Sequence, residues 1–345
     1  MYQNAAATIP RIRARRTRFA YQPLCNFVKC KPFRIIDASF ERSTVFSKRT
    51  EQGQGGPRFS MKLPGLTFLG TAAAVAFVLA SAVPARAQSE DTGAPDRSRL
   101  TVGVGAATLP DYEGADKNNV TPGAVLIGKV ANHDFFTRGT QLYVNLIPSR
   151  SGPGTNIELG VVGAARLERT SKVDNLQVRA LGKIDTAWEA GGYVGISRTG
   201  VITSDYDTLT VRVAYVHDLS DVHDSYVVTP QVNYATPLSI RTLVSVGASA
   251  DYVGKGYGRT YFAVTPAGSL ASGLRTYSIN DSGWKRYNLS AFVLQSLSGD
   301  LRRGFGLGAG VLYGRMLGKY KRSPIVSDVG DADQLAAAVG LTYTF

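Results

Sequence analysis

The sequence predicts an all-β fold: a transmembrane, antiparallel, up-and-down β-barrel. Three observations lead to this prediction. Apolar and polar residues alternate with a period of two over segments of about 10–14 residues, Tyr and Phe recur at the ends of these segments, and the chain closes on an alternating strand that ends in Phe345. Such segments exceed the length of about 5–6 residues usual in soluble sheets, and they can cross an outer membrane when tilted.

The alternation itself is clear in several segments. Between residues 157 and 166, Ile157, Leu159 and Val161 alternate with smaller or charged residues, and Leu209, Val211 and Val213 do the same between 209 and 218. A soluble β-sandwich also alternates. Segment length, aromatic ends and the terminal strand therefore decide in favour of the membrane barrel, with Tyr343 and Phe345 expected to form its assembly signal.

About twelve strands are expected, and the sheet must close because an open edge in hydrocarbon leaves backbone groups unpaired. Their expected ranges are 99–108, 122–132, 135–147, 155–168, 184–198, 207–218, 224–236, 240–253, 259–280, 285–297, 304–317 and 334–345. Ten strands is the alternative, because a Pro-Ala-Gly break interrupts 259–280. An even count places both ends in the periplasm. The expected outward loops are then 109–121, 148–154, 199–206, 237–239, 281–284 and 318–333.

Residues 61–87 have the three-part plan of a cleaved secretory signal. A Met-Lys start precedes an apolar run from Leu66 to Val83, and Ala85 and Ala87 form a small-x-small end, so that Gln88 becomes the mature N-terminus. A membrane anchor is the alternative, because about 18 apolar residues can just span a bilayer. The signal favours export to the outer membrane of a Gram-negative bacterium, with residues 88–345 forming the barrel.

Translation is expected to begin at Met61. Residues 1–60 are then an upstream extension that was included through a misplaced start, and they are expected to be disordered. A basic arm or an organelle-type targeting segment is the alternative. This stretch holds 12 basic and 3 acidic residues, whereas residues 88–345 hold 25 basic and 23 acidic ones. The net charge of +13 therefore gives no support for a nucleic-acid partner. Cys25 and Cys30 lie in the same stretch, and they lack the second pair that a zinc site needs.

Nothing in the sequence predicts catalysis, a metal or a cofactor. The three histidines are His133, His217 and His223, and the last two bracket a segment, HDLSDVHD, whose composition is typical of a turn. Glycine pairs such as Gly103 and Gly105 lie within strands with no helix after them, so they indicate sheet curvature and not a nucleotide loop.

Charged residues on the non-apolar strand faces are expected to point into the lumen. They are Glu158, Arg166, Asp185, Glu189 and Arg212. One interpretation is a mutually neutralising polar interior, and the other is a narrow, charge-lined channel for small solutes.

Two segments are candidates for partner binding. Residues 169–183 exceed the length of a usual periplasmic turn, and Val173, Leu176, Ala180 and Leu181 suggest a short amphipathic helix that either plugs the barrel or docks murein enzymes. Near the last outward loop, four cations could pair with lipopolysaccharide phosphates, although an ordinary solvated loop is an equal alternative. These cations are Arg315, Lys319, Lys321 and Arg322.

Several segments resemble the MltA-interacting protein (MipA/OmpV) family of outer-membrane proteins. They include TLPDYEGADKNNVTPG, KIDTAWEAGGYVG, TYFAVTPAGSLASGLRTYSINDSGWKRYNLS, GRMLGKYKRSPIVSDVG and the closing AAAVGLTYTF, in order along the chain after residue 88. The chain differs from the family at Lys319–Arg322, where acidic or small residues are usual before Ser-Pro-Ile-Val.

The resemblance implies an outer-membrane barrel in contact with lipid and lipopolysaccharide. For the name-giving members it also implies a non-enzymatic scaffold that joins a murein-degrading lytic transglycosylase to a murein synthase. The wider family includes antigens, adhesins and porin-like proteins, so an outer-membrane pore for small solutes is the alternative function.

Overall fold

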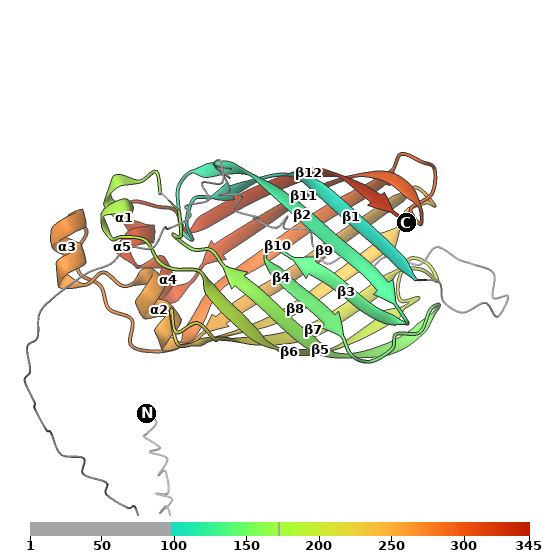
Figure 1. Cartoon of the computed structure of the whole chain (residues 1–345), viewed down its shortest axis with the longest axis horizontal. Coiled ribbons are helices and arrows are strands. Elements are labelled where there is room, and N and C mark those ends of the chain that lie inside the picture. The colour runs from blue at the N-terminus through green and yellow to red at the C-terminus, as the bar shows by residue number, and fades with distance from the viewer. Residues whose placement is uncertain (1–97, 172) are drawn as a thin grey trace, which may run out of the picture. The chain divides into compact units, whose positions relative to one another are not determined.

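The chain forms a closed barrel of twelve antiparallel strands, in which β1 pairs with β12 (Figure 1). The computed structural model describes residues 98–345 apart from Lys172. The twelve-strand barrel is confirmed and the ten-strand alternative is wrong. The strands are β1 (Arg99–Pro110), β2 (Asn118–Val130), β3 (His133–Arg138), β4 (Gln141–Asn145), β5 (Gly154–Arg166), β6 (Ala187–Thr199), β7 (Thr208–Asp218), β8 (Tyr226–Pro237), β9 (Thr242–Val253), β10 (Gly283–Ser296), β11 (Gly304–Met316) and β12 (Asp333–Thr344).

The N-terminal expectations lie outside the described residues. They concern the extension 1–60, the signal 61–87, and the cleavage residues Ala85, Ala87 and Gln88.

The strands expose apolar side chains on one face and bury polar ones on the other. Val104, Ile157 and Val194 are 64%, 65% and 57% exposed, whereas Glu158 and Arg212 on the opposite faces are buried. This distribution is the reverse of a water-soluble barrel and is typical of a wall that faces lipid. No helix among the described residues has both the length and the apolar character to cross a membrane.

Aromatic side chains gather near both ends of the wall, as interfacial girdles do. Trp188 and Trp284 are exposed near one end, and Tyr252 packs edge-on against Trp284 with ring centroids 5.3 Å apart. At the other end Tyr343 contacts both Phe305 and Phe345, with centroids 4.8 and 4.7 Å apart.

The two ends of the barrel differ in their connections. One end, here called the terminal end, holds residue 98, Phe345 and the turns 131–132, 146–153, 200–207, 238–241 and 297–303. The opposite end, the helical end, holds the connections 111–117, 167–186, 219–225, 254–282 and 317–332. These contain α1 (Leu176–Ala180), α2 (Lys255–Phe262), α3 (Pro266–Ser272), α4 (Gly318–Lys321) and α5 (Pro324–Ser327), which Figure 1 shows gathered at the end away from the C-terminus.

The expected strand 135–147 is in fact two short strands, β3 and β4. They are joined by Gly139 and Thr140, and Gly139 adopts φ = 60°, a conformation that glycine tolerates without steric cost. The hairpin returns the chain to the terminal end, where a single strand would have crossed the wall. Strands β5 to β9 therefore run in the opposite direction to the one expected, and the turns 146–153, 200–207 and 238–241 lie at the terminal end.

The expected strand 259–280 is absent, and its residues form α2, α3 and irregular chain. Thr265 caps α3 by accepting the backbone N–H of Gly268, Pro266 occupies the first turn, and Gly273 ends the helix at φ = 73°. These are ordinary helix start and stop signals. The lost strand and the extra hairpin cancel, so the expected count is right although two of its members are wrong.

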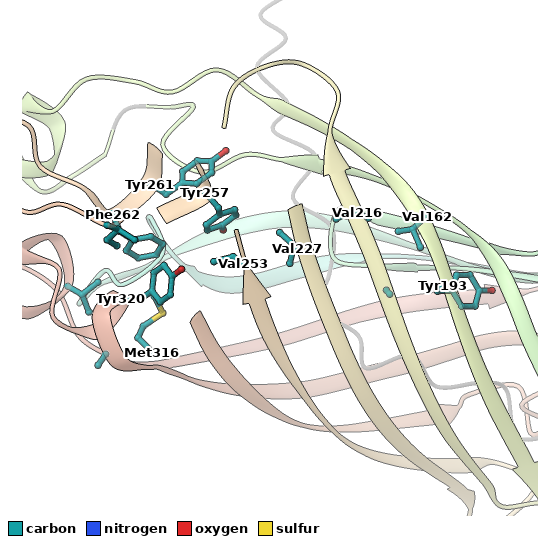
Figure 2. Close-up of a cluster of buried hydrophobic side chains, with 14 of the residues drawn as sticks. Val162, Tyr193, Val216, Val227, Val253, Tyr257, Tyr261, Phe262, Met316 and Tyr320 are labelled. Atoms are coloured by element: carbon teal, nitrogen blue, oxygen red, sulfur yellow. The ribbon is translucent and has the colours of Figure 1, made fainter. Parts of the chain in front are cut away.

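The helical end is filled by a cluster of buried aromatic and aliphatic side chains. Tyr257, Tyr261 and Phe262 from α2 lie beside Tyr320 of α4 and Met316 of β11, and Val162 and Tyr193 continue the cluster along the wall (Figure 2). Tyr257, Phe262 and Tyr320 are fully buried. The helices therefore close this end of the lumen with packed side chains.

Glycine at position 191 is required by close packing between β6 and β7. A Cβ atom there would overlap the carbonyl oxygen of Tyr215, whereas one at Gly163 of β5 would have no heavy atom within 4 Å. We expect Gly191→Ala to destabilise the barrel by about 1–3 kcal/mol or to prevent assembly, because backbone cannot yield as a side chain can. Gly163→Ala is the matched control and should leave heat-modifiable electrophoretic mobility unchanged. Equal mobility and unfolding midpoints for the two variants would contradict this interpretation.

Candidate functional site: a charged network inside the barrel

A row of polar side chains follows the inner wall across neighbouring strands. Arg212 of β7 pairs in register with Gln231 of β8, which pairs with Ser249 of β9, which pairs with Asn288 of β10. Directly paired residues share a face of the sheet. These four side chains, here called the polar row, therefore all point into the lumen.

Arg212 forms an ion pair with a carboxylate and lies beside two aromatic rings. Its Nε and Nη2 donate to Oε2 of Glu158 at 2.7 and 2.5 Å. Gly195 of β6 stands between the two residues in the register, and a Cβ there would come within 3.2 Å of Arg212 Cβ. The guanidinium also lies 4.8 Å from the ring of Phe136 and 5.2 Å from that of Tyr193, within the range of cation–π attraction.

Arg138 crosses the lumen. Its Nη2 donates to Oγ of Ser249 at 2.9 Å. Arg138 belongs to β3 and Ser249 to β9, and the strand order separates these strands by six steps in either direction round the barrel. The hydrogen bond thus joins opposite walls and narrows any passage at the level of the polar row.

A second group of charges lies nearer the helical end. Arg166 donates from Nε and Nη2 to the two carboxylate oxygens of Glu189 at 2.7 and 2.9 Å, the bidentate geometry that makes such pairs strong. Nε2 of His223 lies 2.9 Å from the same carboxylate, and the side chains of His223 and Glu189 are fully buried.

Tyr257 of α2 connects this group to a third. Its hydroxyl accepts from Nη1 of Arg166 at 3.1 Å and from Nζ of Lys285 at 3.0 Å, and it donates to Oε2 of Glu113 at 2.8 Å. Lys285 also contacts Glu113 directly through Nζ and Oε1.

Arg286 completes the network by lying 3.2 Å from Glu113 and 3.0 Å from Asp251. The arrangement joins the 111–117 loop, α2 and strands β5, β6, β9 and β10 through charged contacts. It can hold the helical end shut, and it leaves each of these cations beside a carboxylate.

The charges of this network and burial shift the pKa values of two loop carboxyl groups in opposite directions. Burial raises the pKa of Glu113, but Lys285 and Arg286 outweigh burial, so that the pKa falls to about 2. Burial and the neighbouring Glu113 raise the pKa of Glu168. Glu168 nevertheless accepts the backbone N–H of Glu113 at 3.0 Å, so the two loops are joined at this point.

Four of the five sequence-predicted lumen residues lie inside the barrel. Glu158, Glu189 and Arg212 are buried on the inner face, and Arg166 joins them through Glu189. Asp185 does not belong to this set. Strand β6 begins only at Ala187, so Asp185 lies in the preceding connection and is exposed.

The segment 169–183 lies at the helical end, opposite both termini, because the β3–β4 hairpin reverses the direction of β5. The expected periplasmic location beside the termini is therefore wrong. Val173 is buried and Leu181 is half-buried, whereas Leu176 and Ala180 are exposed, so these four do not form one apolar face. The buried residue of α1 is Val178, which packs with Val173 and Ile325.

Sequence reasoning missed Glu113, Tyr257 and Lys285. Glu113 lies in a loop, where composition gives no direction for its side chain. Tyr257 belongs to none of the expected strands, although Tyr257 and Tyr261 have the spacing that places two residues on one face of a helix. Lys285 lies at the start of a correctly expected strand, and the alternation there does not show that its ammonium is buried.

No group of three or more His, Cys, Asp or Glu residues within the described part of the chain is arranged to hold a metal ion.

An apolar outer face, a charged inner face and a closed antiparallel sheet define a transmembrane β-barrel of the outer-membrane type. The chain belongs to the family described as MltA-interacting protein MipA, whose profile matches residues 102–345. Family and fold together assign the barrel to the outer membrane. No curated protein matches the chain.

Several solved outer-membrane proteins are similar to the chain in fold at low sequence identity. The outer membrane channel DcaP of Acinetobacter baumannii is 11% identical with a TM-score of 0.33, and the match covers 72% of this chain and 96% of that one. OmpT of Vibrio cholerae is 10% identical with a TM-score of 0.32, covering 72% and 97%. The toluene transporter TodX of Pseudomonas putida is 8% identical with a TM-score of 0.31, covering 73% and 90%.

The buried pair of Glu158 and Arg212 should be more costly to break than to remove. Glu158→Gln leaves the Arg212 guanidinium without its anion, and we expect a loss of about 3–5 kcal/mol in unfolding free energy. The double variant Glu158→Gln, Arg212→Met removes both charges and should regain at least half of that loss. Urea unfolding followed by tryptophan fluorescence measures both. A double variant as unstable as the single one would argue against this account of the pair.

Acid should weaken the helical end through Glu113. Because its pKa is lowered in the folded protein, its contribution to stability is full above the ordinary Glu pKa of about 4.5 and is lost as the pH falls towards 2. The thermal unfolding midpoint of the wild type should therefore drop between pH 5 and pH 2. Glu113→Gln should be less stable at pH 7 and should show a smaller drop over that interval. Parallel pH profiles for the two proteins would be evidence against this role.

Proposed function

We propose that the protein is a non-enzymatic outer-membrane scaffold that binds a murein-degrading lytic transglycosylase and a murein synthase. The description of the family, MltA-interacting protein, supports the first partner. The observation that carries the proposal is the hydrogen bond of Arg138 to Ser249 between opposite walls, beneath a helical end filled by packed side chains. A barrel obstructed in this way is better suited to anchoring a partner than to passive flow.

The terminal end is the better candidate for the periplasmic docking surface. Outer-membrane barrels have short periplasmic turns and longer extracellular loops, and here the long connections are at the helical end. One turn, 200–207, is firmly held. Asp207 accepts the backbone N–H groups of Val201, Ile202 and Thr203 at 2.6–2.7 Å, and these bonds outweigh burial and lower the pKa of its carboxyl.

The same turn presents an exposed apolar tip. Ile202 is 71% exposed, and Leu238 and Ile240 of the next turn along the rim are also exposed. Thr203 lies 2.8 Å from Thr236, hydroxyl to hydroxyl, so the first turn is held against the end of β8, which leads into the second turn. This pair of turns offers a partner a fixed apolar surface, which costs little ordering on binding.

The scaffold predicts specific binding of a purified lytic transglycosylase to the purified barrel in detergent. Wild type should retain the enzyme on an affinity column, and Ile202→Asp with Leu238→Asp should weaken its Kd at least tenfold. Leu270→Asp is the matched control, because Leu270 is 90% exposed at the helical end. Absence of binding by a correctly folded wild type would remove the scaffold proposal.

A small-solute channel is the second candidate, because charged pairs such as Arg166–Glu189 and Arg212–Glu158 line the inner wall. The scaffold hypothesis predicts no single-channel current steps for the wild type in planar bilayers. Current steps are expected, if at all, only in Arg138→Ala, which lacks the hydrogen bond between opposite walls. Ion-selective steps in the wild type, lost on neutralising Glu158 and Arg212 together, would favour the channel.

Lipopolysaccharide contact is proposed for Lys321 and Arg322, which are exposed at the helical end. The other two candidate cations are engaged within the protein. Nη1 of Arg315 lies 3.3 Å from Asp333, and Nζ of Lys319 donates to the backbone carbonyls of Asp281 and Ser282 at 2.5 and 2.9 Å.

A further inference from the structure

Strand β2 is paired over its whole length on one side only. Residues 118–129 all pair with β1, but on the other side β2 pairs with β3 only from Ile127 to Val130. Within the described part of the chain, residues 118–125 have no ladder partner on that second side. The wall therefore contains a local strand edge.

The edge exists because the β3–β4 hairpin is short. Phe136 pairs with Ile127, so continuing the register brings Arg138 level with Val125, and there the chain turns at Gly139 and returns as β4. A strand that continued β3 in the same direction would lie beside residues 118–124.

The backbone groups that face this edge can be identified. The N–H of Leu126 donates to Oγ1 of Thr137 at 3.0 Å, and its C=O accepts from the same hydroxyl at 3.4 Å. The polar groups of alternate residues point to the same side of a strand. Those of Ala124, Pro122 and Val120 therefore face the edge.

The proline supports this assignment. Pro122 has no N–H, and proline within a sheet is confined to positions whose N–H would not serve a ladder. Here it removes one donor from the edge. Two N–H groups and three C=O groups of residues 120–124 still face it.

The unpaired backbone groups of the edge lie beside an apolar surface and need a hydrogen-bonding partner there. The side chains of Val120, Pro122 and Ala124 are exposed, Val120 at 75%, and they continue the apolar outer stripe of β2. Each backbone group left unpaired in hydrocarbon costs several kcal/mol. Acyl chains supply neither donors nor acceptors, and lipid esters supply acceptors only. A polypeptide backbone supplies both in alternation.

A second copy of the chain does not fit the edge. Strands of such barrels are tilted by about 35–45° from the membrane normal. Two copies inserted alike and related by a two-fold axis along that normal would therefore have their β2 strands crossing at roughly twice the tilt, and no ladder can form between strands that cross so steeply. The edge therefore suits a different polypeptide.

We propose that the β2 edge, Val120–Ala124, is a β-augmentation site that binds an extended segment of a partner polypeptide. The segment adds one strand, its backbone bonds to Val120, Pro122 and Ala124, and every second side chain is apolar and faces the membrane. This site is separate from the terminal-end surface, and it does not depend on the scaffold function.

Hydrogen exchange on the purified barrel in detergent tests the site. The amides of Val120 and Ala124 should exchange at least 100-fold faster than those of Gly123 and Val125, whose polar groups face β1. An end-capped six-residue peptide of alternating Val and Thr should slow exchange at Val120 and Ala124 at least tenfold. The same peptide N-methylated at every second residue is the control, and it should have no effect.

Ala124→Pro provides the matching variant, because it deletes an edge N–H without removing a bond to β1. It should assemble, and its peptide Kd should rise at least tenfold, whereas Val104→Ala on the outer face of β1 should leave the Kd unchanged. Slow exchange at Val120 and Ala124 in the free wild type would overturn the proposal, as would equal binding of the N-methylated peptide. Because the exchange experiment uses the wild type, it decides the matter even if Ala124→Pro fails to assemble.

Discussion

Pairing of β1 with β12 is the interaction on which the rest of the structure depends. The two terminal strands meet from Thr101↔Thr344 to Thr108↔Ala337, and the backbone N–H of Phe345 donates to Leu100 at 2.9 Å beyond them. In hydrocarbon each unpaired backbone group costs several kcal/mol, so a sheet of this length is stable there only when its first and last strands join. Closure then fixes an inside and an outside. Alternate side chains along each strand then face either the lipid or the lumen.

The composition of the lumen follows from this division of side chains between the two faces. Charges excluded from the lipid face are collected inside, where an isolated ion would be costly to bury. Glu158 and Arg212, Arg166 and Glu189, and Glu113 and Lys285 lie in contact. Aromatic rings lie beside these cations, Phe136 and Tyr193 beside Arg212, and Tyr257 beside Arg166 and Lys285. The interior is therefore a packed core as well as a charged one.

The sequence predicts much of the wall and little of what fills it. Period-two alternation places Glu158 and Arg212 on inner faces, because side-chain direction along a strand is a local property. Which charges meet depends on register, and Gly195 between these two residues gives no hint of their contact. The hairpin at Gly139–Thr140 and the helix begun by Thr265–Pro266 both carry recognisable turn and cap signals, but each lies within a stretch apolar enough to be interpreted as strand. Glu113 cannot be placed from sequence, since a loop residue takes its direction from the strands that the loop connects.

Tyr257 makes the opening of the helical end cooperative. Its hydroxyl group contacts Arg166, Lys285 and Glu113, which belong to β5, β10 and the 111–117 loop. Any outward swing of α2 would break all three contacts together and bring water to the buried charges at the same moment. Opening of this end is therefore expected to be all-or-none, because the contacts of the Tyr257 hydroxyl and the packing of Tyr261 and Phe262 would be lost together.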